Sequence, residues 1–412
     1  MSDTEGNLKA HENLPFIRIR SDWQDGIRKG EKVWISCHVQ GKKPIYGNIL
    51  SNGARNYSDM HIEVDHNDFT AELLSTMVIK VSSVSQNVSS VFHAPFSTFR
   101  NLHKKAVRCV DVSPGGALGI SSSDDGSLNI WNTSDGVVRR CLEGHISDVT
   151  HCRFFPSGVV ALSGGIDMRL RIWSVENGSC PRVLVGHSAA ITDTAIIDKG
   201  KTFVSCSRDG TAKLWDCGEG KCKQTLVDTQ CVINSCALEA CNPGIFNDQT
   251  PMEGTGEDGL GGRALLIARE DGILEAIDIH SGTQIFRSNC HSAINCCDFV
   301  NEHQIIGGCE NGTIFCFDLR NGASASSTYS MGESSVHHLK VHNNKIFVAR
   351  GDGSLQIYNP FEQNVKETLQ LTGPDDDPIY RFCCYGEDVY SACRDGVIRK
   401  YCLDPTKWQF HV

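Results

Sequence analysis

Serine and aspartate recur together at a fixed spacing, each pair preceded by a histidine: His103, Ser121 and Asp125, then His145, Ser163 and Asp167, then His187, Ser205 and Asp209. These residue types could form a nucleophilic triad, in which a base activates one hydroxyl. An active site builds such a triad once, whereas this chain repeats the same set three times. We therefore predict buried polar networks and no catalytic residue.

Possible metal ligands lie close together at Cys290, His291, Cys296 and Cys297. Their spacing matches no standard paired zinc motif, and Cys297 falls in an apolar run that is typical of a buried strand. The stretch Gly259-Leu-Gly-Gly262 opens no predicted helix, so it is not a phosphate loop. We predict no metal and no cofactor.

The composition restricts the class of partner. The 412 residues include 39 basic and 49 acidic ones, for a net charge of -10, so nucleic acid is not an expected partner. No apolar stretch approaches the roughly 18 residues of a membrane span, and the polar start indicates no signal peptide. Many of the 20 cysteines lie in apolar runs and are expected to be reduced core thiols. We expect a cytoplasmic protein, with the nucleus as a further location.

A recurring turn phrase marks the elements that position these side chains. It reads Ser-Asp-Asp-Gly-Ser-Leu-Asn-Ile-Trp at 123–131 and Ser-Arg-Asp-Gly-Thr-Ala-Lys-Leu-Trp at 207–215. The turn residues occupy positions 125, 167, 209, 271, 311, 352 and 395, so copies are 40–43 residues apart except for one step of 62. Asp-Gly and Asn-Gly supply the positive φ angles of tight hairpins. The repeat therefore has seven units.

Each unit has room for four strands. The runs after the turns alternate with period two, and an apolar-led run precedes most turns, beginning at Val107, Val149, Ile191, Ile294, Val336 and Ile379. Such sheets cannot bury both faces alone, so we predict an all-β protein with a seven-bladed propeller over residues 91–412. The last blade lacks an outer strand, which 96–100 can supply, and this closure removes open edges.

Two segments do not follow the repeat. The long step requires an insertion, predicted as a bottom-face loop at about 239–262, between the first and second strands of blade four. Residues 1–90 are predicted to form a small β-rich or α+β domain, with 1–13 disordered. Its β-like runs are Phe16–Arg20, Val33–Ser36, Ile62–Val64 and Met77–Val81.

The repeat resembles the WD-repeat family. Gly144-His145, Gly186-His187 and Trp215-Asp216 match its Gly-His and Trp-Asp signatures. The resemblance implies a hydrogen-bonded chain of histidine, serine, aspartate and tryptophan inside a blade. The matching sets are His103, Ser121, Asp125 and Trp131; His145, Ser163, Asp167 and Trp173; and His187, Ser205, Asp209 and Trp215. The last four blades have Ile277, Phe317, Tyr358 and Tyr401 at the tryptophan position.

One rim of the predicted propeller is rich in acid. This top face carries the Asp-Gly turns and the loops before each first strand. Basic residues there are Lys104, Lys105, Arg208 and Arg394. The acidic residues predicted to bind a partner are Asp124, Asp228, Glu270, Glu310, Glu333, Asp375, Asp376 and Asp377. We expect this face to steer a basic protein surface.

Further stretches resemble the proteasomal ATPase-associated factor family. They include Arg20-Ser-Asp-Trp23, Trp34-Ile-Ser-Cys-His38 and Cys393-Arg-Asp-Gly-Val-Ile-Arg399. The two N-terminal stretches are informative because generic WD repeats lack them. The resemblance implies a non-enzymatic scaffold, a monomer when free, that binds the C-terminal domains of proteasomal ATPase subunits. It also implies a role in assembling the regulatory-particle base and in restraining its docking to the core particle.

Two other functions remain open at this point. Phe317-Asp318-Leu-Arg320 resembles the box of WD proteins that serve as substrate receptors of cullin-based ubiquitin ligases. An enzyme would need a deep central pocket in which perturbed acids converge.

Overall fold

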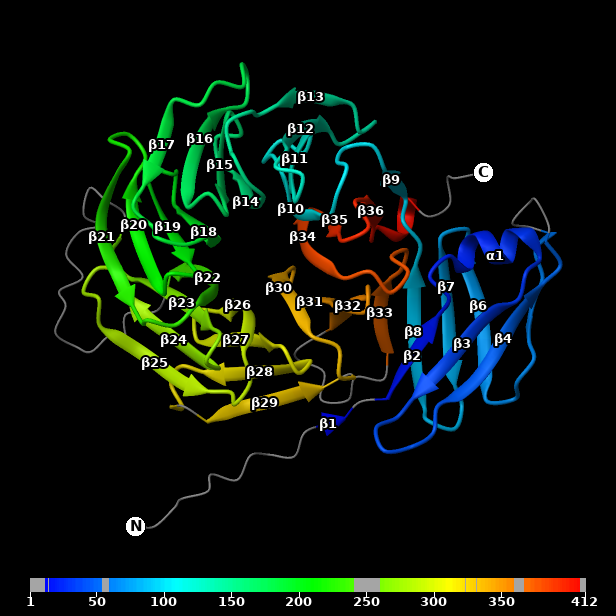
Figure 1. The fold of residues 1–412 in the computed structure, drawn as a ribbon. Coiled ribbons are helices and arrows are strands. Elements are labelled where there is room, and N and C mark those ends of the chain that lie inside the picture. Colours follow the sequence, from blue (N-terminus) through cyan, green and yellow to red (C-terminus); the bar gives the residue numbers. More distant parts are fainter. Residues whose placement is uncertain are drawn as a thin grey trace, which may run out of the picture.

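Hairpins closed by the repeated turns build seven sheets around a central channel, and the first strand of each blade lines that channel (Figure 1). This computed structural model describes residues 12–13, 15–53, 59–240, 260–322, 324–330, 332–358 and 367–407. The predicted fold class is confirmed. All six predicted first-strand starts, from Val107 to Ile379, begin a strand.

The first four blades each use four consecutive antiparallel strands. Blades one and two contain β10 (Val107–Val112), β11 (Leu118–Ser123), β12 (Leu128–Asn132), β13 (Val138–Cys141), β14 (Val149–Phe154), β15 (Val160–Gly165), β16 (Arg169–Ser174) and β17 (Arg182–Val185). Blades three and four contain β18 (Ile191–Ile197), β19 (Thr202–Ser207), β20 (Thr211–Asp216), β21 (Lys221–Asp228), β22 (Ile233–Ala240), β23 (Arg263–Arg269), β24 (Ile273–Asp278) and β25 (Gln284–Asn289).

The last three blades take strands from both ends of the chain. They contain β26 (Ile294–Asn301), β27 (Gln304–Cys309), β28 (Thr313–Asp318), β29 (Ala325–Ser330), β30 (Val336–His342), β31 (Lys345–Arg350), β32 (Leu355–Tyr358), β33 (Glu367–Leu371), β34 (Ile379–Tyr385), β35 (Asp388–Cys393) and β36 (Ile398–Cys402). A 3-10 turn, Pro405–Lys407, follows. The outer strand of blade seven is β9 (Ser97–Phe99), antiparallel to β36, as the closure argument predicts.

The blades are held together by apolar side chains between neighbouring sheets. One cluster joins Leu162 and Leu170 of blade two to Phe203 and Trp215 of blade three. Second and third strands such as β11, β12 and β19 are nearly all buried, whereas outer strands such as β13 are exposed. The described cysteines are free thiols and most are buried, in line with their predicted role as core residues.

The turns need glycine for a steric reason. Gly210 has φ +80°, and a Cβ there would come within 2.9 Å of the Cys231 backbone nitrogen. Positive φ and this close approach together exclude an ordinary side chain. The same crowding occurs at Gly272, against the backbone of Ser292.

The N-terminal part forms two sheets around one core. Strands β2 (Phe16–Ile19), β3 (Val33–His38), β4 (Ile45–Ser51) and β5 (Ile62–Val64) form the first sheet, and β6 (Phe69–Ser75), β7 (Val78–Ser83) and β8 (Val88–His93) belong to the second. Helix α1 (Trp23–Lys29) buries Trp23 and Ile27 in the same core and ends at Gly30, whose φ is 72°. The four predicted β-like runs coincide with β2, β3, β5 and β7.

The second N-terminal sheet continues blade six of the propeller. Strand β8 is parallel to β33, so blade six and β6–β8 form one seven-stranded sheet (Figure 1). The predicted domain boundary at residue 90 falls inside β8. The sequence predicts disorder for 1–13, but Glu12–Asn13 form β1, parallel to β29. Residues 1–11 lie outside the described residues.

The blade-four insertion joins the strands that the sequence indicates. It follows β22 and precedes β23, the first and second strands of that blade. Residues 241–259 lie outside the described residues, so the predicted loop itself remains a prediction.

Candidate functional site

The repeated histidine, serine, aspartate and tryptophan side chains come together inside blades two and three. His145 places Nδ1 2.9 Å from Asp167 and Nε2 2.7 Å from Ser163, and Trp173 Nε1 donates to the same serine at 2.8 Å. Blade three repeats this with His187, Asp209, Ser205 and Trp215. The serine hydroxyl therefore lies between the imidazole and the indole, inside the sheet.

Blade one brings together three members of its set. His103 Nε2 lies 2.6 Å from Ser121, which accepts a hydrogen bond from Trp131, but Nδ1 lies 2.6 Å from Ser127 and 3.9 Å from Asp125. Asp125 instead accepts the backbone N–H of Lys104. All three serines are completely buried. The networks tie the top loop to the blade core and offer no nucleophile to a substrate.

These imidazoles make stability depend on pH. Burial lowers the pKa of His103 to about 4, and burial also lowers the pKa of His145 and His187. An unfolded histidine has a pKa of about 6.5, so the unfolded chain takes up protons first as the pH falls. We expect the free energy of unfolding to decrease as pH falls from about 6.5 to about 4, with about 2 kcal/mol lost at pH 5 through His103 alone.

Calorimetry at pH 7 and pH 5 measures this loss. His103→Gln, which has no imidazole, should lose less stability between the two pH values than the unchanged protein. Equal losses in the two proteins would contradict this role for His103.

A ring of bulged residues surrounds the top mouth of the channel. In every blade the pairing of the first and second strands shifts register around the second residue of the first strand. We call these residues the mouth ring: Arg108, Thr150, Thr192, Asn234, Asn295, His337 and Tyr380. A β-bulge changes the direction in which the bulged residue's side chain points. Here one bulge in each of the seven blades lies at the same rim.

Four members of the mouth ring connect neighbouring blades. Thr150 and Thr192 donate at 2.6 Å to the carbonyl oxygens of Ile191 and Ile233, the first residues of the next blades. Asn234 and Asn295 make the same connection at 2.9 and 3.0 Å. From blade two to blade six, the mouth ring therefore links the blades.

The other three members form a cluster of their own. The Arg108 guanidinium lies 4.3 Å from the ring centroid of Tyr380, and His337 meets the same ring edge-on at 5.8 Å. Arg108 also pairs with Asp124 at 2.6 Å. Blades six, seven and one therefore carry large side chains where the others carry a connecting hydrogen bond. This departure from sevenfold repetition marks the candidate site.

An acidic cavity of about 390 Å³ lies beside this cluster, on the top face of blades five to seven. Its residues, called the acidic cavity below, are Glu310, Glu333, Ser334, Ser335, His337, Gly351, Asp352 and Pro378. Three carboxylates face it without a lysine or arginine in the lining. Burial lowers the pKa of His337, which keeps the imidazole neutral at pH 7. The cavity can therefore receive a cationic side chain.

The predicted partner-binding acids divide into four pairs. Glu310 and Glu333 line the acidic cavity, while Asp375 and Asp376 line a second one, of about 80 Å³, that shares Asp352 with it. Asp124 and Asp377 are paired with Arg108 and Arg394, at 2.6 and 2.7 Å. Asp228 and Glu270 are exposed on blades three and four, and line neither cavity.

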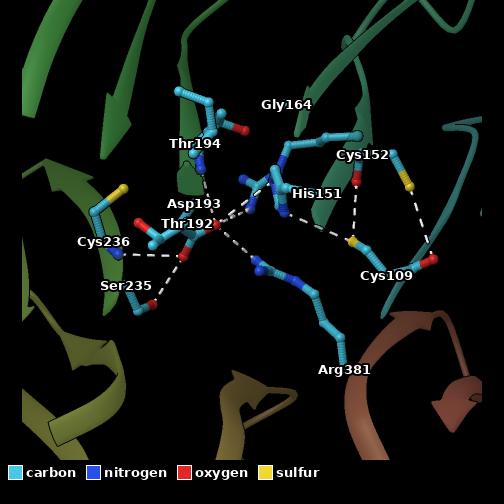
Figure 2. A network of polar contacts seen from close by, with 12 residues as sticks. Cys109, His151, Cys152, Gly164, Thr192, Asp193, Thr194, Ser235, Cys236 and Arg381 are labelled. Atoms are coloured by element: carbon cyan, nitrogen blue, oxygen red, sulfur yellow. Dashed lines mark hydrogen bonds and ion pairs between the residues drawn. The ribbon is translucent and has the colours of Figure 1, made fainter. Parts of the chain in front are cut away.

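The channel contains a Cys-His-Asp arrangement that also has to be judged as chemistry. Cys109 Sγ lies 3.6 Å from His151 Nδ1, and His151 Nε2 lies 3.5 Å from Asp193 (Figure 2). The Cys109 Sγ is already 3.2 Å from the Cys152 carbonyl oxygen, and Cys109 and His151 are 1% and 0% exposed. A substrate carbonyl cannot reach this sulfur, so the arrangement does not fit a nucleophilic site.

Asp193 is the centre of that network. Arg381, from blade seven, reaches across to it at 3.0 Å, and Ser235 of blade four donates to it at 2.8 Å (Figure 2). Burial would raise the pKa of Asp193, but the Arg381 charge holds it well below its usual range. A buried ion pair thus connects blades three and seven through the channel, whose cavity measures about 400 Å³.

The described residues contain no group of three or more His, Cys, Asp or Glu side chains that could hold a metal ion. Cys290, Cys296 and Cys297 are buried among apolar residues. Among the described helices, none has the length and apolar character that a membrane crossing requires.

Comparison with known proteins identifies the family. The WD domain, G-beta repeat model matches residues 94–132, 136–174, 178–216 and 282–318. Proteasomal ATPase-associated factor 1 of Bos taurus is 47% identical over 390 residues, which cover 94% of this chain and 98% of the relative. The chain belongs to the proteasomal ATPase-associated factor 1 family. The Homo sapiens member is 44% identical with the same coverage, and a probable member from Dictyostelium discoideum is 36% identical over 94% of this chain.

Sequence reasoning missed part of the site in this family member. Asp352 is the turn residue of the sixth repeat, and the repeat pattern predicts only a place in a turn for it. Blade six has no histidine network to hold it, and its carboxylate faces the acidic cavity and Arg18. The missing histidine is the signal that could have shown that Asp352 is not held in a histidine network. His337, Tyr380 and Arg108 could have been found by comparing the residues after each first-strand start.

The candidate cullin-adaptor box is internally paired. Phe317 is 2% exposed, and Arg320 makes two hydrogen bonds to Asp318, at 2.6 and 2.9 Å. The hydrogen bonds from Arg320 lower the pKa of Asp318 to about 2. This pairing explains the conformation of Arg320 without a partner.

Proposed function

We propose that this protein binds the C-terminal domains of proteasomal ATPase subunits through the acidic cavity on the top face. The observation that carries the proposal is a cavity with three carboxylates and no lysine or arginine in its lining, beside the part of the mouth ring where ring and cation contacts replace the connecting hydrogen bonds. The name of the relatives, proteasomal ATPase-associated factor 1, supports an ATPase subunit as the partner.

The mechanism requires no reaction. The net charge of -10 and the acidic cavity attract a basic surface, which raises the association rate. A specific complex of this kind buries about 1,200–2,000 Å². A monomer that covers this much of an ATPase C-terminal domain would assist assembly of the regulatory-particle base and restrain docking to the core particle by steric exclusion. Competition for the covered surface would release it, in the cytoplasm and in the nucleus.

Charge reversal tests this proposal. Glu310→Lys together with Glu333→Lys is expected to weaken binding of ATPase C-terminal domains at least about tenfold and to flatten its salt dependence, because both carboxylates face the cavity and are exposed. Isothermal titration at two salt concentrations measures both effects.

A matched control makes the same change in charge at the opposite face. Glu176→Lys with Glu219→Lys places two lysines in exposed turns between third and fourth strands. This control should bind almost as the unchanged protein does. Equal weakening by both pairs would point to overall charge rather than the acidic cavity, and unchanged binding by the first pair would contradict the proposed site.

The alternative, a substrate receptor of a cullin-based ligase, gains no support from the described residues. Its candidate contact, Arg320, is held by Asp318. Co-purification with the cullin adaptor that is lost on Arg320→Ala would restore this alternative.

A further inference from the structure

The outer face of the first N-terminal sheet carries four aromatic side chains, of which two are exposed and two are half-buried. We call Phe16, Trp34, His38 and Tyr46 the aromatic face; they lie on the adjacent strands β2, β3 and β4. Trp34 is 45% exposed and Tyr46 is 64% exposed. His38 stacks on Phe16 at 5.1 Å and meets Tyr46 edge-on at 6.4 Å. These ring contacts hold Phe16, His38 and Tyr46 against one another.

The aromatic face is held against the acidic top face by direct contacts. Arg18 of β2 pairs with Asp352 at 2.5 Å, and Ser21 donates to Asp375 at 3.2 Å. Phe16 packs so closely on Gly332, in the loop before β30, that a Cβ there would lie 3.3 Å from its ring. Strand β8 also continues blade six (Figure 1). These contacts and this pairing give the aromatic face and the acidic cavity a fixed relation.

The small cavity lies where the two surfaces meet. Its lining includes Trp34, Arg18, Asp352, Asp375 and Asp376, and its volume is about 80 Å³. Pockets that enclose small-molecule ligands measure about 300–1,000 Å³, so this one accommodates only the end of a single side chain. Three carboxylates against one guanidinium favour a cation, and the indole of Trp34 adds a π face for it.

We propose that the N-terminal domain forms one wall of the partner-binding surface and that the small cavity takes a lysine or arginine side chain of the bound protein. The segment that carries this side chain places apolar neighbours on Trp34 and Tyr46. Charge complementarity selects such a basic segment over an acidic or purely apolar one. This inference rests on the proposed function, because it extends the same surface across Asp352 onto the N-terminal sheet.

Truncation of the exposed aromatic side chains tests whether the N-terminal domain contributes to the binding surface. Trp34→Ala and Tyr46→Ala, alone and together, should leave the thermal midpoint nearly unchanged because both side chains are exposed. Exposed tryptophan and tyrosine are frequent interface hot spots, so Trp34→Ala should weaken binding of isolated ATPase C-terminal domains at least tenfold. Trp34→Phe, which keeps an aromatic face, should recover part of the affinity.

Tyr385→Ala is the matched control. Tyr385 is 39% exposed and ends β34, at the opposite end of blade seven from the top face. The Tyr385→Ala variant should bind ATPase C-terminal domains as the unchanged protein does. If the unchanged protein and the double variant Trp34→Ala with Tyr46→Ala bind equally well, the N-terminal domain is not part of the binding surface, while the proposed function stands. If no C-terminal domain binds the unchanged protein, both fail together.

Discussion

Replacing Arg381 with methionine is expected to lower the free energy of unfolding by about 3–5 kcal/mol, the usual cost of leaving one member of a buried ion pair alone. Asp193 is 2% exposed and keeps Ser235 and two backbone N–H groups as partners, but Arg381 is the cation nearest to it, at 3.0 Å. Methionine retains most of the side-chain volume, so the decrease in the free energy of unfolding measures mainly the effect of removing the positive charge. Urea denaturation measures the change.

Two variants separate this effect from general disruption of the channel. Arg381→Met with Asp193→Asn removes both charges and should recover at least half of the loss. Arg153→Met removes a cation that is more exposed and lies 4.0 Å from Asp193, and it should cost less than about 1 kcal/mol. A double variant no more stable than Arg381→Met alone would contradict the ion-pair explanation.

Trp215→Ala is expected to destabilise the propeller by about 3–5 kcal/mol, since it removes a large side chain from a close-packed site. Trp215 is 1% exposed, packs on Phe203, and belongs to the cluster that joins blades two and three. Trp215→Phe keeps much of the volume and loses the hydrogen bond from Nε1 to Ser205.

The comparison between these two substitutions isolates packing from hydrogen bonding. The phenylalanine variant should cost clearly less than the alanine variant, because Ser205 retains its contact with His187. Differential scanning calorimetry gives both values. Equal losses would mean that the hydrogen-bonded chain, rather than the packing, dominates this position.

The propeller could be predicted because its determinants are local and repeated. A two-residue turn and alternating side chains specify each hairpin, and the serine-to-tryptophan spacing specifies the networks of the first three blades. The polar contacts of the last four blades could not be predicted in this way, because these blades lack the histidine, serine, aspartate and tryptophan set. Arg269 bonds to Asp271 in blade four, Arg350 to Gln356 in blade six, and Arg399 to Asp395 in blade seven. These arginines and their partners do not recur at one fixed spacing, so no repeated pattern predicts the pairs.

The same limit applies to the site. The acidic character of the top face follows from counting charges, but whether a carboxylate is available depends on its neighbours. Asp377 and Asp124 are neutralised by arginines that only the folded structure brings near. Helix α1 is seven residues long, too short for a periodic pattern, and only the pair Trp23 and Ile27 shows which side faces the core.

Strands β8 and β9 are synthesised long before the strands with which they pair. Only 94–96 separate the strand that pairs with blade six from the strand that closes blade seven. Both leave the ribosome early, yet their partners, β33 and β36, are among the last strands to emerge. Until then these edges have no native neighbour, and unpaired edges are where chains aggregate. The nascent chain is therefore exposed to aggregation until Cys402 is released, and a stop codon before Ile398 would leave β9 permanently without its partner.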